Sequence, residues 1–167
     1  MLDPMVYLEC LKIVSERDHL AESRLSPVML NEIMAVEDEL GVALPEQYED
    51  FLLKVGPGSE YGGLAYWHHL DLTRSDNILE LNKKLHGDSK KQSAHTLKKF
   101  LSVYDPCDGT LIGFHRFNGT YSPEMFMWSS ETDQLESIAD DFSSFLQTNI
   151  DCDQEELEEA ERRAVGI

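Results

Sequence analysis

The chain has few cysteines and no long apolar run. Its 167 residues include three cysteines, Cys10, Cys107 and Cys152, which are widely spaced and form no Cys-x-x-Cys pair. This argues against a disulfide framework and predicts reduced cysteines that pack in the interior. No run of about 18 apolar residues is present, so no membrane span is predicted. The N-terminus carries acids early and no basic region, unlike a signal peptide, so we expect a cytoplasmic protein.

Basic residues are also scarce. The chain has 14 Lys and Arg against 32 Asp and Glu, giving a net charge of −18. We expect no direct contact with nucleic acid or membrane, because phosphate binding is driven by Lys and Arg. Bases are absent between Arg116 and Arg162, and again from Glu32 to Asp50. These acidic stretches either keep the protein soluble or recruit a basic protein, and the sequence leaves both possibilities open.

The histidines do not form a convincing metal site. Adjacent residues on a strand point to opposite faces, so His68 and His69 cannot easily bind one ion. His69 and Asp71 could share a face, which supplies two ligands at best, and no spacing demands a third. We therefore predict no metal and no cofactor.

A catalytic cysteine is not expected either. Cys107 could pair with His115, but the neighbouring Asp105 and Asp108 would raise the pKa of its thiol. The glycine pairs after residue 55 lack the following helix and the Lys/Ser pattern of a phosphate loop. The absence of a coherent catalytic set favours a binding protein over an enzyme.

The apolar periodicity predicts helices first, strands next and a helix last. Expected helices span residues 3–16, 27–40, 45–55 and 76–86, the last capped by Asp76 or Ser75. Expected strands span 64–70, 100–104, 110–117, 124–128 and 134–138. This order predicts an α+β fold with an antiparallel sheet of about four to six strands and a closing C-terminal helix. We expect one domain over residues 1–150 and an acidic tail or solvated helix over 151–167.

Two helices have a clearly predicted apolar face. In the second helix the side chains available for burial are Met29, Leu30, Ile33, Met34 and Val36. The closing helix begins at an Asp140 or Asp141 cap. Its inward residues are Phe142, Phe145 and Leu146.

The stretch from Glu37 to Gly63 has the clearest backbone pattern. Gly41 sits where a helix that ends near Leu40 needs a left-handed residue. Leu44-Pro45 disfavours helix at Leu44 and presets the first helical φ at Pro45. The helix that follows is predicted to bury one face, formed by Tyr48, Phe51, Leu52 and Val55.

These residues follow the pattern Glu-x-x-Leu-Gly-x-x-Leu-Pro-x-x-Tyr-x-x-Phe-Leu, followed by glycines. The matching positions are Glu37, Leu40, Gly41, Leu44, Pro45, Tyr48, Phe51 and Leu52. The pattern resembles the signature of the SMI1/KNR4 family within the SUKH superfamily. The later strands and the Phe-x-x-Phe-Leu helix fit the same family in the same order. Val55-Gly56 departs from the Asn-Gly often found there, which affects a helix cap and no chemistry.

The resemblance implies a non-catalytic, protein-binding domain. Bacterial proteins similar to this family commonly act as immunity proteins that neutralise a cognate toxin, and many such toxins are nucleases with basic surfaces. The acidic charge then predicts that this chain blocks a basic toxin with an acidic surface. Charge alone selects the partner-facing residues, which are Glu46, Glu49, Asp50, Glu124, Glu131 and Asp133.

Two other function classes stay open. Eukaryotic proteins that resemble this family act as regulatory scaffolds in cell-wall signalling and carry long disordered flanks, of which this chain has almost none. An enzyme with a diffuse site would need a deep pocket with convergent polar groups such as Tyr66, His68 and His115. The sequence names neither the partner nor the oligomeric state.

Overall fold

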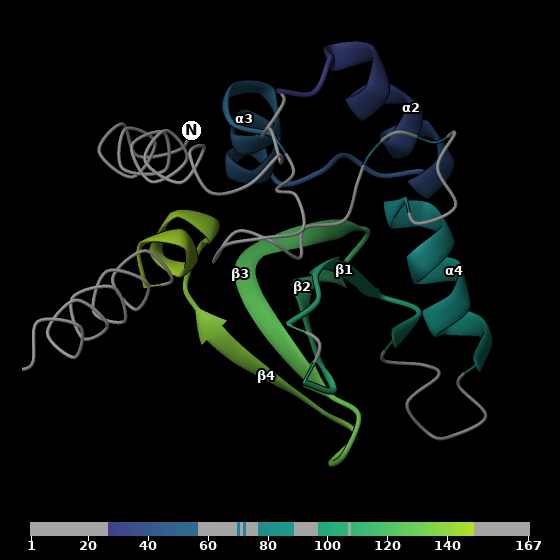
Figure 1. Ribbon diagram of the computed structural model, residues 1–167, viewed down its shortest axis with the longest axis vertical. Helices are drawn as coiled ribbons and strands as arrows, with labels where there is room; N and C mark the ends of the chain where they lie inside the picture. Colours follow the sequence, from purple (N-terminus) through teal and green to yellow (C-terminus); the bar gives the residue numbers. More distant parts are fainter. Residues whose placement is uncertain are drawn as a thin grey trace, which may run out of the picture.

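The described chain forms helices, a four-stranded sheet and a closing helix (Figure 1). The computed structural model describes residues 27–56, 70, 72, 77–88, 97–106 and 108–148. Its helices are α2 (Leu30–Leu40), α3 (Glu46–Lys54), α4 (Ile78–Asp88) and a closing helix over residues 142–148. Its strands are β1 (Phe100–Tyr104), β2 (Thr110–Phe117), β3 (Thr120–Ser129) and β4 (Gln134–Ala139). The predicted helix over 3–16, residues 64–69 of the predicted strand over 64–70, and the segment 151–167 lie outside the described residues, whereas Leu70 is described and buried.

The sheet consists of consecutive antiparallel hairpins in the order β1-β2-β3-β4. The β2–β3 reversal uses Asn118 and Gly119, whose φ values of 50° and 92° suit a tight hairpin turn. This confirms the predicted α+β fold with an antiparallel sheet. β3 begins at Thr120 rather than at the predicted Glu124. The strand continues through Pro123 because the β2–β3 register shifts there, and proline is tolerated at such an irregularity.

One face of the sheet carries the main core. Four rings meet there: Tyr48 and Phe51 from α3, Phe114 from β2 and Phe142 from the closing helix. The ring centroids of Tyr48 lie 5.5 Å from Phe114 and 5.3 Å from Phe142. Aromatic pairs at such tilted and edge-on geometries gain energy beyond the area that they bury. The predicted inward faces of α3 and of the closing helix are therefore confirmed.

The other face of the sheet carries a smaller apolar cluster. Leu97, Phe100 and Phe126 are buried in it, and half-buried side chains from α4, β2, β3 and β4 pack around them. Both faces of the sheet thus contribute apolar contacts, and α4 lies beside β1 at one edge (Figure 1).

α2 differs from its predicted form at both its start and its buried face. The helix begins at Leu30 rather than at Pro27, because the Glu32 carboxylate accepts a hydrogen bond from the Met29 N–H at 2.8 Å. The prediction that Met29, Leu30 and Met34 are buried is wrong. Only the side of the helix that carries Ile33 and Val36 faces the core, and these two side chains are fully buried. Met29, Leu30 and Met34 are among the most exposed large apolar residues described.

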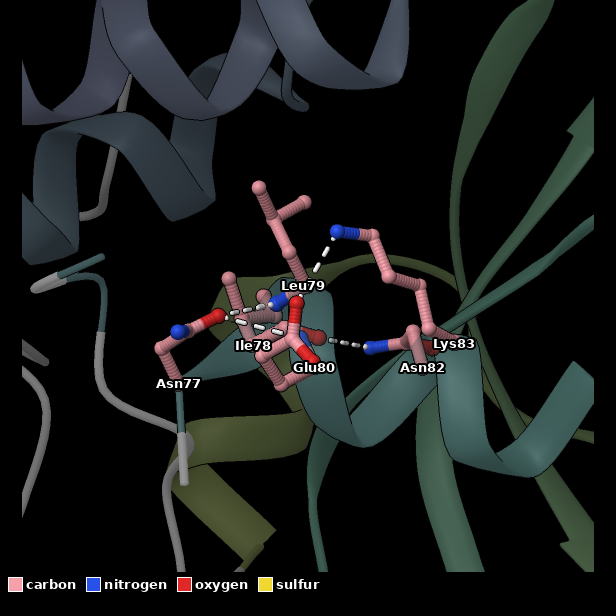
Figure 2. Close-up of polar contacts among 6 residues, drawn as sticks. All are labelled: Asn77, Ile78, Leu79, Glu80, Asn82 and Lys83. Carbon is pink, nitrogen blue, oxygen red and sulfur yellow. Dashed lines mark hydrogen bonds and ion pairs between the residues drawn. The ribbon is translucent and has the colours of Figure 1, made fainter. Parts of the chain in front are cut away.

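Two asparagines fix α4 in place (Figure 2). The cap is Asn77, rather than the predicted Asp76 or Ser75, and its Oδ1 accepts hydrogen bonds from the N–H groups of Leu79 and Glu80. The buried Asn82 donates to the carbonyl oxygen of Ile78 at 2.8 Å within the helix. Its amide also donates to the Ser102 carbonyl oxygen at 2.9 Å and accepts from the Ser102 N–H at 2.8 Å. α4 is thereby hydrogen-bonded to the backbone of β1.

Replacing Asn82 should weaken the fold. Asn82→Ala removes both hydrogen bonds to Ser102 and leaves buried backbone groups unsatisfied, so we expect a loss of about 2–4 kcal/mol in the free energy of unfolding. Urea denaturation measures this loss. The matched control is Asn31→Ala on the exposed surface of α2, which should change stability by less than about 0.5 kcal/mol. Equal stability of the two variants would contradict the role of Asn82.

Candidate functional site

The loop between α2 and α3 is held by one carboxylate. The Oε1 atom of Glu37 accepts a hydrogen bond from the Leu44 N–H at 2.7 Å, seven residues along the chain. The Glu37 carbonyl oxygen also accepts from the Gly41 N–H at 2.8 Å. Gly41 has a φ of 64°, the left-handed conformation that glycine adopts without steric cost. The predicted helix end at Gly41 is confirmed.

The helix after this loop buries the rest of the sequence pattern. Pro45 is the N-cap of α3, so the helix begins at Glu46, one residue after the predicted first helical position. Tyr48, Phe51 and Leu52 are fully buried, and burial raises the pKa of Tyr48, so its phenol stays neutral. The Leu52 carbonyl oxygen accepts a hydrogen bond from the Val28 N–H at 2.8 Å, which ties the start of the described chain to α3. The eight signature positions therefore build the scaffold and leave the outer face of α3 free to vary.

That outer face carries three of the predicted partner-facing acids. Glu46 is exposed, and Glu49 and Asp50 are half-buried. Burial raises the pKa of Glu49, and the nearby charges of Glu37, Asp50 and Glu46 raise it further. Asp50 accepts a hydrogen bond from Lys54 at 3.0 Å one turn later. Burial and the neighbouring acids of α2 and α3 thus both disfavour the ionised form of Glu49.

Glu124 lies toward the same end of the sheet as α3. It precedes Met125, which pairs with Ala139 at the end of β4. Two residues further on, Asp141 accepts a hydrogen bond from the Gln47 side chain of α3 at 3.2 Å. The Glu124 carboxylate itself accepts from the Ser122 hydroxyl at 3.1 Å. Adjacent residues on a strand point to opposite faces, and Met125 is buried in the core that α3 covers, so the Glu124 side chain points to the other face of the sheet.

Glu131 and Asp133 lie elsewhere. Both belong to the turn between β3 and β4, at the opposite end of the sheet from α3 (Figure 1). Asp133 has a φ of 56°, and its Oδ1 accepts a hydrogen bond from the Trp128 indole at 3.1 Å. The six predicted acids thus do not form one surface. We call Glu46, Glu49 and Asp50 the α3 surface, and Glu131 and Asp133 the hairpin tip; Glu124 belongs to neither.

The fold and the sequence pattern agree with one known family. A SUKH family model described as "SMI1-KNR4 cell-wall" matches residues 30–146, which is more than half of the chain. The chain belongs to the SMI1/KNR4 family. The match runs from the first residue of α2 into the closing helix, so it includes every described strand. No curated protein matches the chain.

SMI1/KNR4 membership supports a binding role in general. The family consists broadly of non-enzymatic immunity or interaction domains, so protein–protein interaction is the coarse function. Among the described helices, none is long and apolar enough to cross a membrane. The described residues also contain no group of three or more His, Cys, Asp or Glu that could hold a metal ion.

His115 is the one candidate for chemistry in this SMI1/KNR4 chain that the structure describes. Its ring is buried against Phe117, with centroids 4.4 Å apart, and near Phe126 at 5.8 Å. Burial lowers the pKa of His115, and Lys99 lowers it further, so the imidazole is neutral at pH 7. The other candidates lie outside the described residues, namely Cys107, Tyr66, His68, His69 and Asp71.

The Glu37 hydrogen bond can be tested by its removal. Glu37→Ala leaves the part-buried Leu44 N–H without its acceptor, so we expect a loss of about 1–3 kcal/mol in the free energy of unfolding. Chemical denaturation measures the change. Asp38→Ala removes the neighbouring exposed carboxylate and should cost much less. If both variants lose the same amount, loss of charge rather than of the Leu44 bond is responsible.

Neutralising Glu49 should stabilise the protein at neutral pH. The folded state raises the pKa of Glu49, so its ionised form is disfavoured in the folded chain relative to the unfolded chain. Glu49→Gln should therefore raise Tm at every pH above the folded-state pKa of Glu49. The gain should shrink as the pH falls through that pKa and vanish below the unfolded value, where both states are protonated. Thermal denaturation from pH 7 to pH 3 measures it, and a pH-independent gain would contradict the assignment.

Proposed function

We propose that the protein is a cytoplasmic immunity protein that binds a basic cognate toxin and covers its basic surface. Family membership supports protein binding, and the net charge of −18 supports a basic partner. The observation that carries the proposal is the crowding of acids around the α3 surface, where burial, and then the charges of Glu37, Asp50 and Glu46, raise the pKa of Glu49. Cationic side chains of a partner would relieve this repulsion and stabilise the ionised form of Glu49. The ionised acids would in turn attract those cations and strengthen binding.

The mechanism is blockade rather than chemistry. A nuclease toxin needs a basic surface for its anionic substrate, and an acidic protein that occupies this surface excludes the substrate. Complementary charge also speeds the encounter, to about 10⁸ M⁻¹s⁻¹ at low salt, and the rate should fall as salt rises. The partner-facing residues that we propose are those of the α3 surface and of the hairpin tip, together with Glu124.

A pull-down from the native host lysate tests the proposal. The immobilised chain should retain a basic protein at low salt and release it at high salt, and mass spectrometry identifies that protein. The nuclease activity of the purified partner should then fall when the chain is added. Recovery of no basic partner would overturn the proposal, and a salt-insensitive partner would favour the regulatory scaffold instead.

Charge reversal separates the two groups of acids. The triple variant Glu46→Lys/Glu49→Lys/Asp50→Lys should weaken partner binding by at least about tenfold and flatten its salt dependence. Glu131→Lys tests the hairpin tip while keeping the Asp133 bond to Trp128. Surface plasmon resonance at several salt concentrations measures both variants. Unchanged affinity and salt dependence in both would rule out these acids as the partner-facing surface.

A further inference from the structure

The outer side of α2 exposes apolar side chains that the fold does not bury. We define the α2 face as Met29, Leu30, Met34 and Asp38. Met29 is 69% exposed, Leu30 53% and Met34 55%, and Asp38 is exposed as well. Leu30, Met34 and Asp38 follow one another at four-residue spacing, so they form one stripe along the helix. A contiguous group of exposed apolar side chains bordered by polar ones is typical of an interaction surface.

The surroundings of this stripe are acidic. α2 contains four acids and no Lys or Arg: Glu32, Glu37, Asp38 and Glu39. Its charge extends onto α3, since Glu37 is one of the groups that keep the pKa of Glu49 above its ordinary value. Figure 1 shows α2 and α3 adjacent at one end of the molecule, joined by the loop that Glu37 holds. The apolar stripe and the proposed α3 surface therefore lie on neighbouring helices.

Charge decides which occupant fits this face. A second copy would bring another net charge of −18 and another acidic α2 into contact, which is repulsive. Anionic membranes and nucleic acids are repelled for the same reason. A protein with exposed Lys or Arg is attracted, and an apolar groove between those cations would match the stripe.

We propose that the α2 face is the apolar centre of the partner interface, with Leu30 and Met34 inserted into an apolar groove that Lys or Arg side chains border on a basic protein. This rests on the proposed function, because the occupant is the basic partner inferred there. Helix-in-groove recognition uses anchors at this spacing. Methionine side chains adapt to irregular grooves, and apolar anchors inside a polar rim carry most of the energy of an interface.

The first test uses a defined probe and the methionines of the chain. The probe is an amphipathic helical peptide of leucine and lysine, about four turns long. In methyl-labelled protein, the Met29 and Met34 resonances should shift on titration, whereas Met125, which is fully buried, should not. A lysine-only peptide of equal charge should leave Met29 and Met34 unchanged. Absence of shifts at these two residues, or equal shifts with both peptides, would overturn the proposal.

The second test removes the stripe. Leu30→Ser/Met34→Ser should weaken binding of the leucine–lysine peptide by at least about tenfold, as loss of two anchor side chains predicts. It should leave Tm unchanged, because both side chains are exposed. Ile138→Ser is the matched control, since Ile138 is an exposed apolar residue on β4, and it should not change binding. A large drop in Tm would show that the chain itself uses this face. A wild-type dimer that the double variant no longer forms would assign the face to a second copy. Either result would overturn the proposal.

The same double variant separates this inference from the proposed function. If the wild-type chain retains no basic protein from the lysate, the proposed function fails, and the peptide titration still decides whether the α2 face binds basic apolar surfaces. If the wild type and the double variant retain one basic partner with equal affinity, the proposed function stands and the α2 face is not its contact surface.

Discussion

The packing of Tyr48 against Phe114 and Phe142 is the contact on which the rest of the structure depends. It joins α3, β2 and the closing helix, three segments that are far apart in the sequence. The Gln47 side chain strengthens the same junction, since it bonds both the Asp141 carboxylate and the Ser143 N–H. Without this junction α3 and the closing helix would have no fixed position over the sheet.

The family signature and the proposed binding surface occupy opposite sides of the same helix. Tyr48, Phe51 and Leu52 face the core, and Glu37 closes the loop that starts α3. The acids between them face outward and take no part in the core. A scaffold of this kind can keep its fold while its outer side chains change, so family membership indicates protein binding without naming the partner.

The local elements could be predicted from the sequence because their causes are local. The bounds of β1 and β2 match the prediction, and the Gly41 cap and the buried face of α3 follow from residues within one or two helical turns. The exposure of Leu30 and Met34 could not be predicted, since an apolar side chain on a helix does not show which side of that helix meets the sheet. The cap at Asn77 was missed because Ser75 and Asp76 have the same capping chemistry.

Part of the candidate site was open to prediction for the same reason. Glu46, Glu49 and Asp50 share one short helix, so their proximity follows from helical spacing. The position of Glu124 and the separation of the hairpin tip from α3 depend on the pairing of β3 with its neighbours, which is set by long-range contacts and by the irregularity around Pro123. The sequence identified the acidic residues, but their positions relative to one another depend on how the sheet folds.

The Asn82 bonds have a further consequence for how separate copies of the chain behave. A strand with free backbone groups is a template for pairing with another chain, and folded proteins block such pairing. The Asn82 amide fills that role at β1, where it occupies the donor and the acceptor of Ser102 as a neighbouring strand would. At the other edge, β4 carries the charge of Glu136, and its pairing with β3 skips Ile138, which marks a bulge. Among the described strands, the outer two thus limit pairing with another chain by different means, a side chain from a helix at β1 and a charged, irregular strand at β4.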